Sequence, residues 1–270
     1  MVDASVGFHC PECVAQAAAR SRSPITPMGG TPIRRATVTQ VLIGINLVAF
    51  VLELVAGLDG VITGFGMSPA AVSVGGEWWR LLTAAFLHGG FLHIAFNMYV
   101  LWVIGPQLES VFGHIRYLIL FLLSALGGSV VSYTFGPFAT VSVGASGAIF
   151  GLMAALIVAG RSMRADVTQI VILLVINVVI GFVAPGIDWR AHLGGAVVGA
   201  VVAAVMAYAP KDGRVLWQSL GVLAVCAILV TMMLLRTAQI NGEVALLIDN
   251  SGQAMAGPTE QRQDDPGDHQ

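Results

Sequence analysis

The sequence predicts an all-α polytopic membrane protein, on the basis of its composition, its hydropathy and seven long apolar runs. Of the 270 residues, 56% are hydrophobic and 10% are charged, whereas soluble domains usually carry about 25% charged residues. The mean hydropathy is +0.83, so the chain cannot cover a water-facing surface with polar groups. The formal net charge of −2 argues against a nucleic-acid partner, which would need a basic surface.

A spanning helix needs about 20 mostly apolar residues, because each adds about 1.5 Å across an apolar layer about 30 Å thick. Seven runs are candidates: 37–57, 90–107, 115–135, 146–160, 168–184, 189–209 and 215–236. The stretch 58–89 is apolar but too interrupted by glycine to span as one helix. We expect four parts along the chain: an N-terminal segment 1–36, a core 37–209, a seventh helix within 210–236, and a polar, disordered tail 237–270.

The distribution of lysine and arginine predicts the orientation in the membrane, because these residues accumulate in cytoplasmic loops. A cytoplasmic N-terminus places most of them inside: Arg20, Arg22, Arg34, Arg35, Arg116, Arg161, Arg164, Lys211 and Arg214. Fewer fall outside: Arg80, Arg190, Arg236 and Arg262. Residues 1–36 lack the apolar core of a secretory signal peptide, so the first span is expected to be an uncleaved anchor. The sequence thus predicts a multi-pass plasma-membrane protein with its C-terminus outside.

Strongly polar side chains are costly in membrane helices, so each one points to a function. The informative set lies in or beside the second, fourth and sixth spans: His88, His93, Asn97, Ser146 and His192. In the predicted topology these three helices all run from outside to inside. All of the set except His88 lie in the first turns of their helices. Those four side chains are therefore expected at one depth, near the outer face.

Ser146 lies in Gly144-Ala145-Ser146-Gly147, at the predicted start of the fourth helix. A serine becomes a good nucleophile when a base takes its proton, and the free N–H groups of a helix start can bind the oxyanion that forms. This helix is short, about 22 Å for its roughly 15 residues, which would recess its start in a water-filled pocket. The alternative is a serine that only caps the helix.

His192 is a candidate for the base, because small residues follow it on its own helical face. Gly195 and Gly199 lie three and seven residues later, and such spacing lets two helices approach closely. The fourth helix offers Gly147 and Gly151 in return. Glycines at this spacing also occur where they serve packing alone, and that alternative stays open.

His93 and Asn97 are one helical turn apart on one face, and both can donate hydrogen bonds to an oxyanion. The competing interpretation is a metal site formed by His88, His93 and His192, but the chain lacks a His-Glu-x-x-His spacing. Asp188 precedes His192 by four residues. It is interpreted as the N-cap of the sixth helix, with completion of a catalytic triad as the alternative.

Together these residues resemble the rhomboid family of intramembrane serine proteases over about residues 77–205. The resemblance rests on motifs that stand in family order: Trp79-Arg80; His88, His93 and Asn97; Glu109 and Gly113; Gly144-Ala145-Ser146-Gly147; and Ala191-His192 with Gly195 and Gly199. It implies a six-helix rhomboid-like catalytic core, to which the seventh helix adds a six-plus-one arrangement.

The family resemblance also implies roles for individual residues. Ser146 and His192 would form a catalytic dyad, and His93 and Asn97 would complete the oxyanion hole beside the Ser146 backbone. The remaining motif residues would be structural: Trp79, Arg80, His88, Glu109, Gly113, Gly144, Gly147, Gly195 and Gly199. Phe150 stands where the family often has a tyrosine that stacks on the catalytic histidine, so it can stack but has no hydroxyl.

The N-terminal run Phe8-His9-Cys10-Pro11-Glu12-Cys13 resembles the end of a small zinc-binding module found ahead of some actinobacterial relatives. A structural zinc site needs four ligands, and this run offers at most His9, Cys10 and Cys13. We therefore expect a remnant Cys-x-x-Cys without a metal, and no cofactor elsewhere.

The expected function is that of a serine endopeptidase that cleaves transmembrane segments of other membrane proteins near the outer face. Its partners would be transmembrane protein substrates and the lipid bilayer. The first alternative is a catalytically silent rhomboid-like protein that binds membrane clients, although such proteins typically lose the serine or the histidine. The second is a channel or transporter, which would place charges near the midplane or break helices in paired halves.

Overall fold

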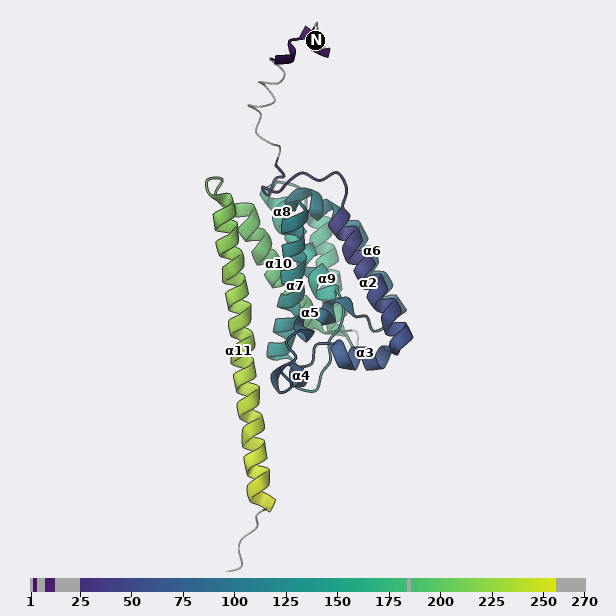
Figure 1. The fold of residues 1–270 in the computed structure, drawn as a ribbon, viewed down its shortest axis with the longest axis vertical. Coiled ribbons are helices and arrows are strands. Elements are labelled where there is room, and N and C mark those ends of the chain that lie inside the picture. The colour runs from purple at the N-terminus through teal and green to yellow at the C-terminus, as the bar shows by residue number, and fades with distance from the viewer. Residues whose placement is uncertain (1, 4–7, 13–24, 184–185, 256–270) are drawn as a thin grey trace, which may run out of the picture.

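A computed structural model describes residues 2–3, 8–12, 25–183 and 186–255. Cys13 and the end of the predicted disordered tail, 256–270, lie outside the described residues. Near the N-terminus, strands β1 (Val2–Asp3) and β2 (Phe8–His9) form a short antiparallel pair. The rest of the described chain is built from helices, which lie side by side as a bundle (Figure 1).

Five helices are long and apolar enough to cross a membrane: α2 (Thr37–Ala56), α6 (Phe91–Phe112), α7 (His114–Phe135), α10 (Trp189–Tyr208) and α11 (Arg214–Met255). Two shorter apolar helices, α8 (Ser146–Ser162) and α9 (Thr168–Val183), complete the bundle. All seven coincide with the predicted apolar runs. The prediction of an all-α polytopic membrane protein is confirmed, whereas the number of spans stays a prediction.

Helix α8 occupies the centre of the bundle and packs against α7 and α10. Glycines make this contact close. A Cβ atom added to Gly195 of α10 would lie 1.9 Å from the carbonyl oxygen of Gly147, and one added to Gly199 would lie 2.4 Å from the Cα of Gly151. The two backbones are therefore in direct contact, as the small residues on both faces predicted.

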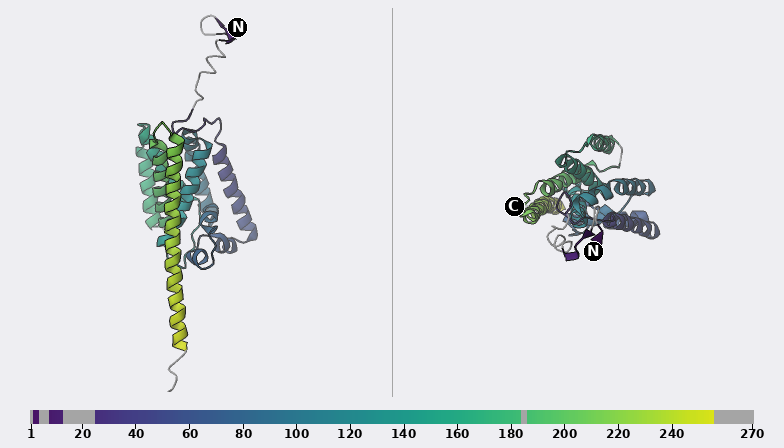
Figure 2. Two further views of the ribbon diagram at one scale, coloured as in Figure 1. Left: turned by 60° about the vertical axis from the view of Figure 1, so that its left-hand side comes forward. Right: turned by 90° about the horizontal axis from the view of Figure 1, so that it is seen from above.

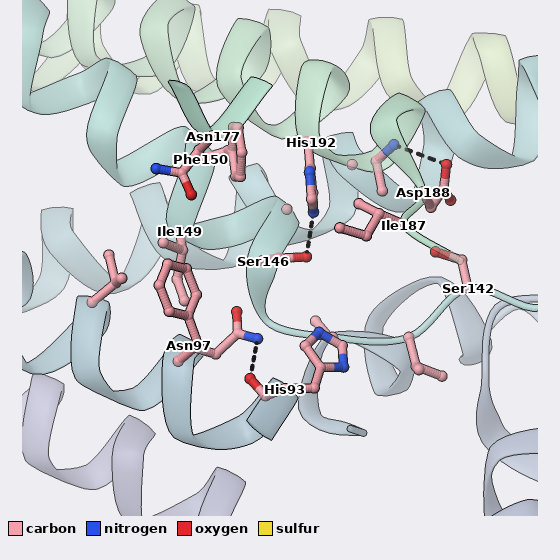
Figure 3. Close-up of a pocket in the computed structure, with 18 of the residues that line it drawn as sticks. His93, Asn97, Ser142, Ser146, Ile149, Phe150, Asn177, Ile187, Asp188 and His192 are labelled. Carbon is pink, nitrogen blue, oxygen red and sulfur yellow. Dashed lines mark hydrogen bonds between the residues drawn. The ribbon is translucent and has the colours of Figure 1, made fainter. Parts of the chain in front are cut away.

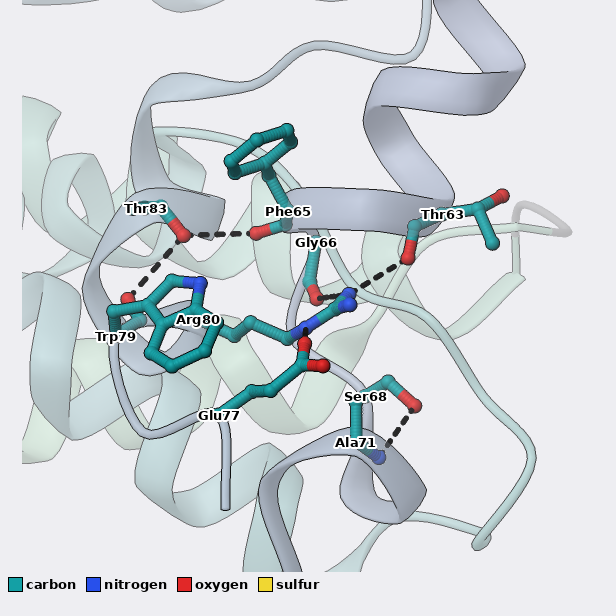
Figure 4. A network of polar contacts seen from close by, with 9 residues as sticks. All are labelled: Thr63, Phe65, Gly66, Ser68, Ala71, Glu77, Trp79, Arg80 and Thr83. Carbon is teal, nitrogen blue, oxygen red and sulfur yellow. Dashed lines mark hydrogen bonds and ion pairs between the residues drawn. The ribbon is translucent and has the colours of Figure 1, made fainter. Parts of the chain in front are cut away.

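The segment between α2 and α6 forms short helices: α3 (Leu58–Phe65), α4 (Pro69–Ser73), α5 (Arg80–Thr83) and the 3₁₀ turn η1 (Ala84–Phe86). Arg80 ties them together, as Figure 4 shows. Its guanidinium donates to the carbonyl oxygens of Thr63, at 2.7 Å, and Gly66, at 3.0 Å, and pairs with the carboxylate of Glu77. Trp79, by contrast, is half exposed.

Glu109 joins the cytoplasmic end of α6, in the predicted orientation, to the start of α2. Its buried carboxylate accepts from the backbone N–H groups of Val38 and Thr39 and from the Thr39 hydroxyl, at 2.7 to 2.9 Å. These two N–H groups belong to the first turn of α2, where a helix has no acceptors of its own. Gly113, with φ of 79°, forms the sharp turn between α6 and α7.

Helix α11 differs from the sequence-based expectation in length. It continues to Met255, although the polar tail was predicted to begin at residue 237. Its 42 residues amount to about 63 Å, roughly twice the apolar thickness of a membrane. It lies against α7 and α10 and runs well past the other helices (Figures 1 and 2). It also contacts α4, and Ile240, which lies beyond the apolar run, is buried.

Candidate active site

The start of α8 presents Ser146 to the interior of the bundle. The chain enters it through Gly144, whose φ of 126° is open to glycine but strained for other residues. The Gly144 N–H donates to the carbonyl oxygen of Ala84 at 2.8 Å, which joins this loop to η1. A Cβ at Gly144 would also lie 2.8 Å from the His93 ring. Glycine is therefore required here by conformation and by space.

Ser146 and His192 meet across the contact between α8 and α10. The Ser146 Oγ lies 2.8 Å from the His192 Nε2, within hydrogen-bonding distance. Figure 3 shows the two side chains facing each other from different helices. They are 46 residues apart in the chain. The contact between Gly147, directly after Ser146, and Gly195, three residues after His192, brings the two backbones close enough for this bond.

The imidazole of His192 is held in one orientation by its neighbours. Phe150, one turn after Ser146, stacks on the ring at a centroid distance of 4.2 Å and an interplanar angle of 11°. This is the stacking expected at that position. The second ring nitrogen, Nδ1, is buried and has no hydrogen-bond partner in the described part of the chain. Among the described residues, therefore, no carboxylate forms a hydrogen bond with this nitrogen.

Asp188 is the N-cap of α10, as the sequence indicated. One carboxylate oxygen accepts from the backbone N–H groups of Arg190 and Ala191, and the other accepts from the Ser132 hydroxyl of α7. The carboxylate thus serves the helix start and the contact with α7. Asp188 fixes the start of the helix that carries His192, but it does not bind the imidazole.

His93 and Asn97 lie on α6, on the opposite side of Ser146 from His192 (Figure 3). The His93 Nδ1 faces the backbone N–H of Gly89 at 3.3 Å. Because a neutral imidazole has one donor and one acceptor nitrogen, this contact assigns the proton to Nε2, which lies beside Gly144. The Asn97 amide donates to the His93 carbonyl oxygen at 2.8 Å, and its remaining amide atoms border the cavity.

A cavity of about 500 Å³ opens between α6, α7, α8, α9 and α10. His93, Asn97, Ser146 and His192 all line it, so these four side chains of the predicted set come together around one cavity. The other motif residues either lie outside the cavity or are glycines whose role is in the backbone conformation and the helix contact. His88 is buried behind His93, and Trp79, Arg80, Glu109 and Gly113 are outside the cavity lining.

The metal alternative has no geometric support in the described residues, where no three His, Cys, Asp or Glu side chains are grouped to hold an ion. The rings of His88 and His93 pack edge to face, with centroids 5.1 Å apart and an interplanar angle of 63°.

Two polar residues near this site were overlooked in the sequence. Glu53 lies in the last turn of α2 and is buried against the backbone of His88. Asn177 lies midway along α9 and lines the cavity beside Leu173 and Ile180. In both cases a strongly polar residue interrupts an apolar run, which is the signal that could have identified them.

Comparison with known proteins agrees with this arrangement. The rhomboid domain model matches residues 75–209, half of the chain. Rhomboid protease GluP of Bacillus subtilis is 37% identical over 187 residues, covering 66% of this chain and 36% of GluP. RHOMBOID-like protein 5 of Arabidopsis thaliana is 40% identical over 148 residues, covering 52% of this chain and 48% of the relative.

Rhomboid protease AarA of Providencia stuartii is 27% identical over 230 residues, covering 73% of this chain and 81% of AarA. The chain spans between a third and a half of the length of GluP and the Arabidopsis relative. The match to the domain model covers all of the candidate site residues on α6, α8 and α10. On this evidence the chain is a multi-pass membrane protein that belongs to the rhomboid family.

Proposed function

We propose that this protein is an intramembrane serine endopeptidase in which Ser146 is the nucleophile and His192 the general base. The observation that carries the proposal is the 2.8 Å contact between Ser146 Oγ and His192 Nε2, made by two helices whose backbones touch. Nucleophile and base within hydrogen-bonding reach are the signature of nucleophilic catalysis. Two relatives, GluP and AarA, are themselves rhomboid proteases.

The catalytic unit is a dyad. For His192 to accept the Ser146 proton through Nε2, its own proton must sit on Nδ1. The ring is held for this task by Phe150, not by a carboxylate. After attack on the scissile carbonyl, the protonated imidazole returns its proton to the leaving amine. Water then completes hydrolysis of the acyl-enzyme by the same two residues.

The oxyanion hole combines the start of α8 with α6. The first N–H groups of a helix have no acceptors within it, and here they adjoin the nucleophile at Ser146 and Gly147. His93 supplies Nε2–H, and Asn97 supplies its side-chain amide. Donors fixed before the reaction stabilise the developing negative charge without reorganisation. These four donors, two backbone N–H groups and two side chains, lie on the side of the cavity opposite His192, where the oxyanion forms.

The substrates are transmembrane segments of other membrane proteins, cleaved near the outer face of the plasma membrane. The charge distribution supports a cytoplasmic N-terminus, which places the start of α8 toward the outside. The 17 residues of α8 measure about 25 Å, so its start is recessed below the membrane surface. A helical substrate shields its peptide carbonyls, and residues that weaken the helix near the cut therefore favour cleavage.

The test is covalent labelling of the detergent-solubilised protein by a fluorophosphonate, which reacts with activated serines. Ser146→Ala and His192→Ala are each expected to abolish labelling and cleavage of a model transmembrane substrate. The double variant should be no worse than either single one, because the two residues act as a unit. Ser142→Ala is the matched control, since Ser142 borders the same cavity without an imidazole partner; it should still be labelled.

Substrate binding without labelling or cleavage by the unmodified protein would instead identify a catalytically silent client-binding member of the family. Cleavage that survives Ser146→Ala would contradict the proposal. Mass spectrometry of the products should place the cut near the outer boundary of the substrate span, and consistent cuts at the cytoplasmic boundary would overturn the orientation.

A further inference from the structure

Helix α2 carries a buried carboxyl group, that of Glu53, within a membrane span, where burying an acidic side chain costs free energy. Glu53 is 1% exposed and lies within a span of mean hydropathy 2.1. Among the described residues it forms no ion pair. One of its oxygens, Oε2, accepts from the backbone N–H of His88 at 3.0 Å, and the other has no partner. A buried acidic group kept at this cost calls for a role that an apolar residue could not fill.

The residue that Glu53 holds is itself fully buried. His88 is 0% exposed, and within the described part of the chain neither of its ring nitrogens has a partner in hydrogen-bonding geometry, although the Phe86 carbonyl lies near the ring. Its ring packs edge-on against the ring of His93. His88 is therefore fixed by Glu53 through its backbone and contacts His93 through its side chain.

The next backbone N–H along the chain also acts on His93. Gly89 N–H points at the His93 Nδ1, at 3.3 Å. His88 and Gly89 thus donate consecutive N–H groups, the first to Glu53 and the second to His93. A shift of this turn would move the Gly89 donor, and the turn leads directly into α6 through Gly90, with φ of 149°. The Glu53 carboxyl anchors the turn from outside α6.

The tautomer of His93 depends on that second contact. An N–H donor facing Nδ1 favours the tautomer that carries its proton on Nε2. Nε2 is the nitrogen that lies against Gly144, two residues before Ser146. Only in this tautomer does a neutral His93 offer a hydrogen-bond donor toward the nucleophile. The opposite tautomer would present a lone pair to a developing negative charge.

We propose that Glu53 is a positioning residue for the oxyanion hole: it anchors the His88-Gly89 turn, and the turn holds His93 in the Nε2–H tautomer. This inference rests on the proposed function, since it assigns His93 its role in the reaction. Glu53 acts only through the turn and through His93, and it does not touch the substrate. An amide at residue 53 keeps an acceptor oxygen for the His88 N–H, whereas an aliphatic side chain removes it.

The kinetic test compares Glu53→Gln with Glu53→Leu, each in the unmodified protein and in a His93→Ala background, on a transmembrane substrate. Glu53→Gln should retain activity. Glu53→Leu should lower kcat by about 10-fold with little change in KM, because a displaced donor weakens transition-state binding. In the His93→Ala background Glu53→Leu should cost less than about 2-fold, because residues that act through one another are not additive. Equal losses in both backgrounds would overturn the proposal.

A second measurement is independent of activity and of the Leu variant's folding. Nitrogen-15 NMR of imidazole-labelled protein carrying Ser146→Ala, with His93 assigned by its loss in His93→Ala, reports the tautomer directly. The expected signal is that of an Nε2–H ring, kept in Glu53→Gln. An Nδ1–H ring in the otherwise unmodified protein would overturn the proposal. Failure of the protease assignment would look different, as cleavage that does not depend on Ser146.

Discussion

Helices α8 and α9 follow each other in the chain and are the two short apolar helices of the bundle, yet they are packed differently. Most residues of α8 are buried, and its glycines touch the backbone of α10. Along α9, over Thr168–Val183, only Gly181 is buried. The remaining side chains of α9 are exposed or only partly buried. Two neighbouring helices of similar length thus differ in how much of their surface is packed against the rest of the protein.

The difference separates two requirements of the proposed reaction. A nucleophile and base must be held within a fraction of an ångström, which demands rigid elements, and Ser146 and His192 come from the tightly packed pair. A cavity that admits part of another protein needs a wall that moves at low cost. Segments with few buried contacts are those that open most readily. We therefore expect helix α9, which supplies Leu173, Asn177 and Ile180 to the cavity, to be that wall.

The largest effect is expected from a single methyl group in the tight contact. Gly195→Ala would place its Cβ 1.9 Å from the Gly147 carbonyl oxygen, so α8 and α10 must separate. We expect a loss of about 3 kcal/mol or more in stability, together with loss of activity, in thermal unfolding in detergent. Gly44→Ala on α2 is the matched control, because nothing lies within 4 Å of the added Cβ. Equal melting temperatures for the two variants would contradict the comparison.

The tight pair is also the part of the site that could be predicted from sequence. Membrane helices must be about 20 apolar residues long, so hydropathy located all seven helices, and the direction of each helix then placed Ser146, His93, Asn97 and His192 at one depth. The glycine spacing predicted the close contact. The orientation of each side chain within that layer depends on tertiary contacts, such as Phe150 against His192, that no local pattern contains.

Two features were harder to predict for physical reasons. Hydropathy indicates where the apolar membrane layer ends, not where a helix ends. Helix α11 continues beyond the apolar run to Met255 with no proline in it, although Asn241-Gly242 is a sequence pattern that favours a turn. Glu53 was overlooked because its partner is a backbone N–H of His88, 35 residues away. A backbone hydrogen-bond partner cannot be identified from residue types, because every residue except proline has the same N–H group, whereas the two side chains of a dyad can.

The two asparagines that line the cavity allow the comparison to be tested through chemistry. Asn97 comes from α6 and is buried beside Ser146, whereas Asn177 comes from the loosely packed α9. Asn97→Ala should lower kcat by about 10- to 1000-fold, the range for one lost oxyanion donor. Its loss of stability should be about 1 kcal/mol, because one hydrogen bond to the His93 carbonyl disappears.

Asn177→Ala should leave kcat within about 10-fold, because Asn177 lies on α9, whereas the proposed oxyanion hole is formed by α6 and the start of α8, so no oxyanion contact is lost. Rates and melting temperatures of both variants should be measured together. An Asn97→Ala protein that loses activity only in proportion to its folded fraction would remove Asn97 from the oxyanion hole.

The smallest effect is expected where α9 touches the dyad. A Cβ on Gly181 would lie 3.2 Å from the His192 Nδ1, closer than an ordinary contact by a few tenths of an ångström. In the α8–α10 contact an added Cβ would instead meet backbone atoms of the facing helix. Here α9 can shift outward, because no other residue of Thr168–Val183 is buried. Gly181→Ala should therefore change stability by less than about 0.5 kcal/mol and kcat by at most about 3-fold, since about 1.4 kcal/mol corresponds to a factor of ten. A loss of activity as large as that of Gly195→Ala would show that α9 is held as firmly as α10, and the distinction between a rigid pair and a yielding wall would fail.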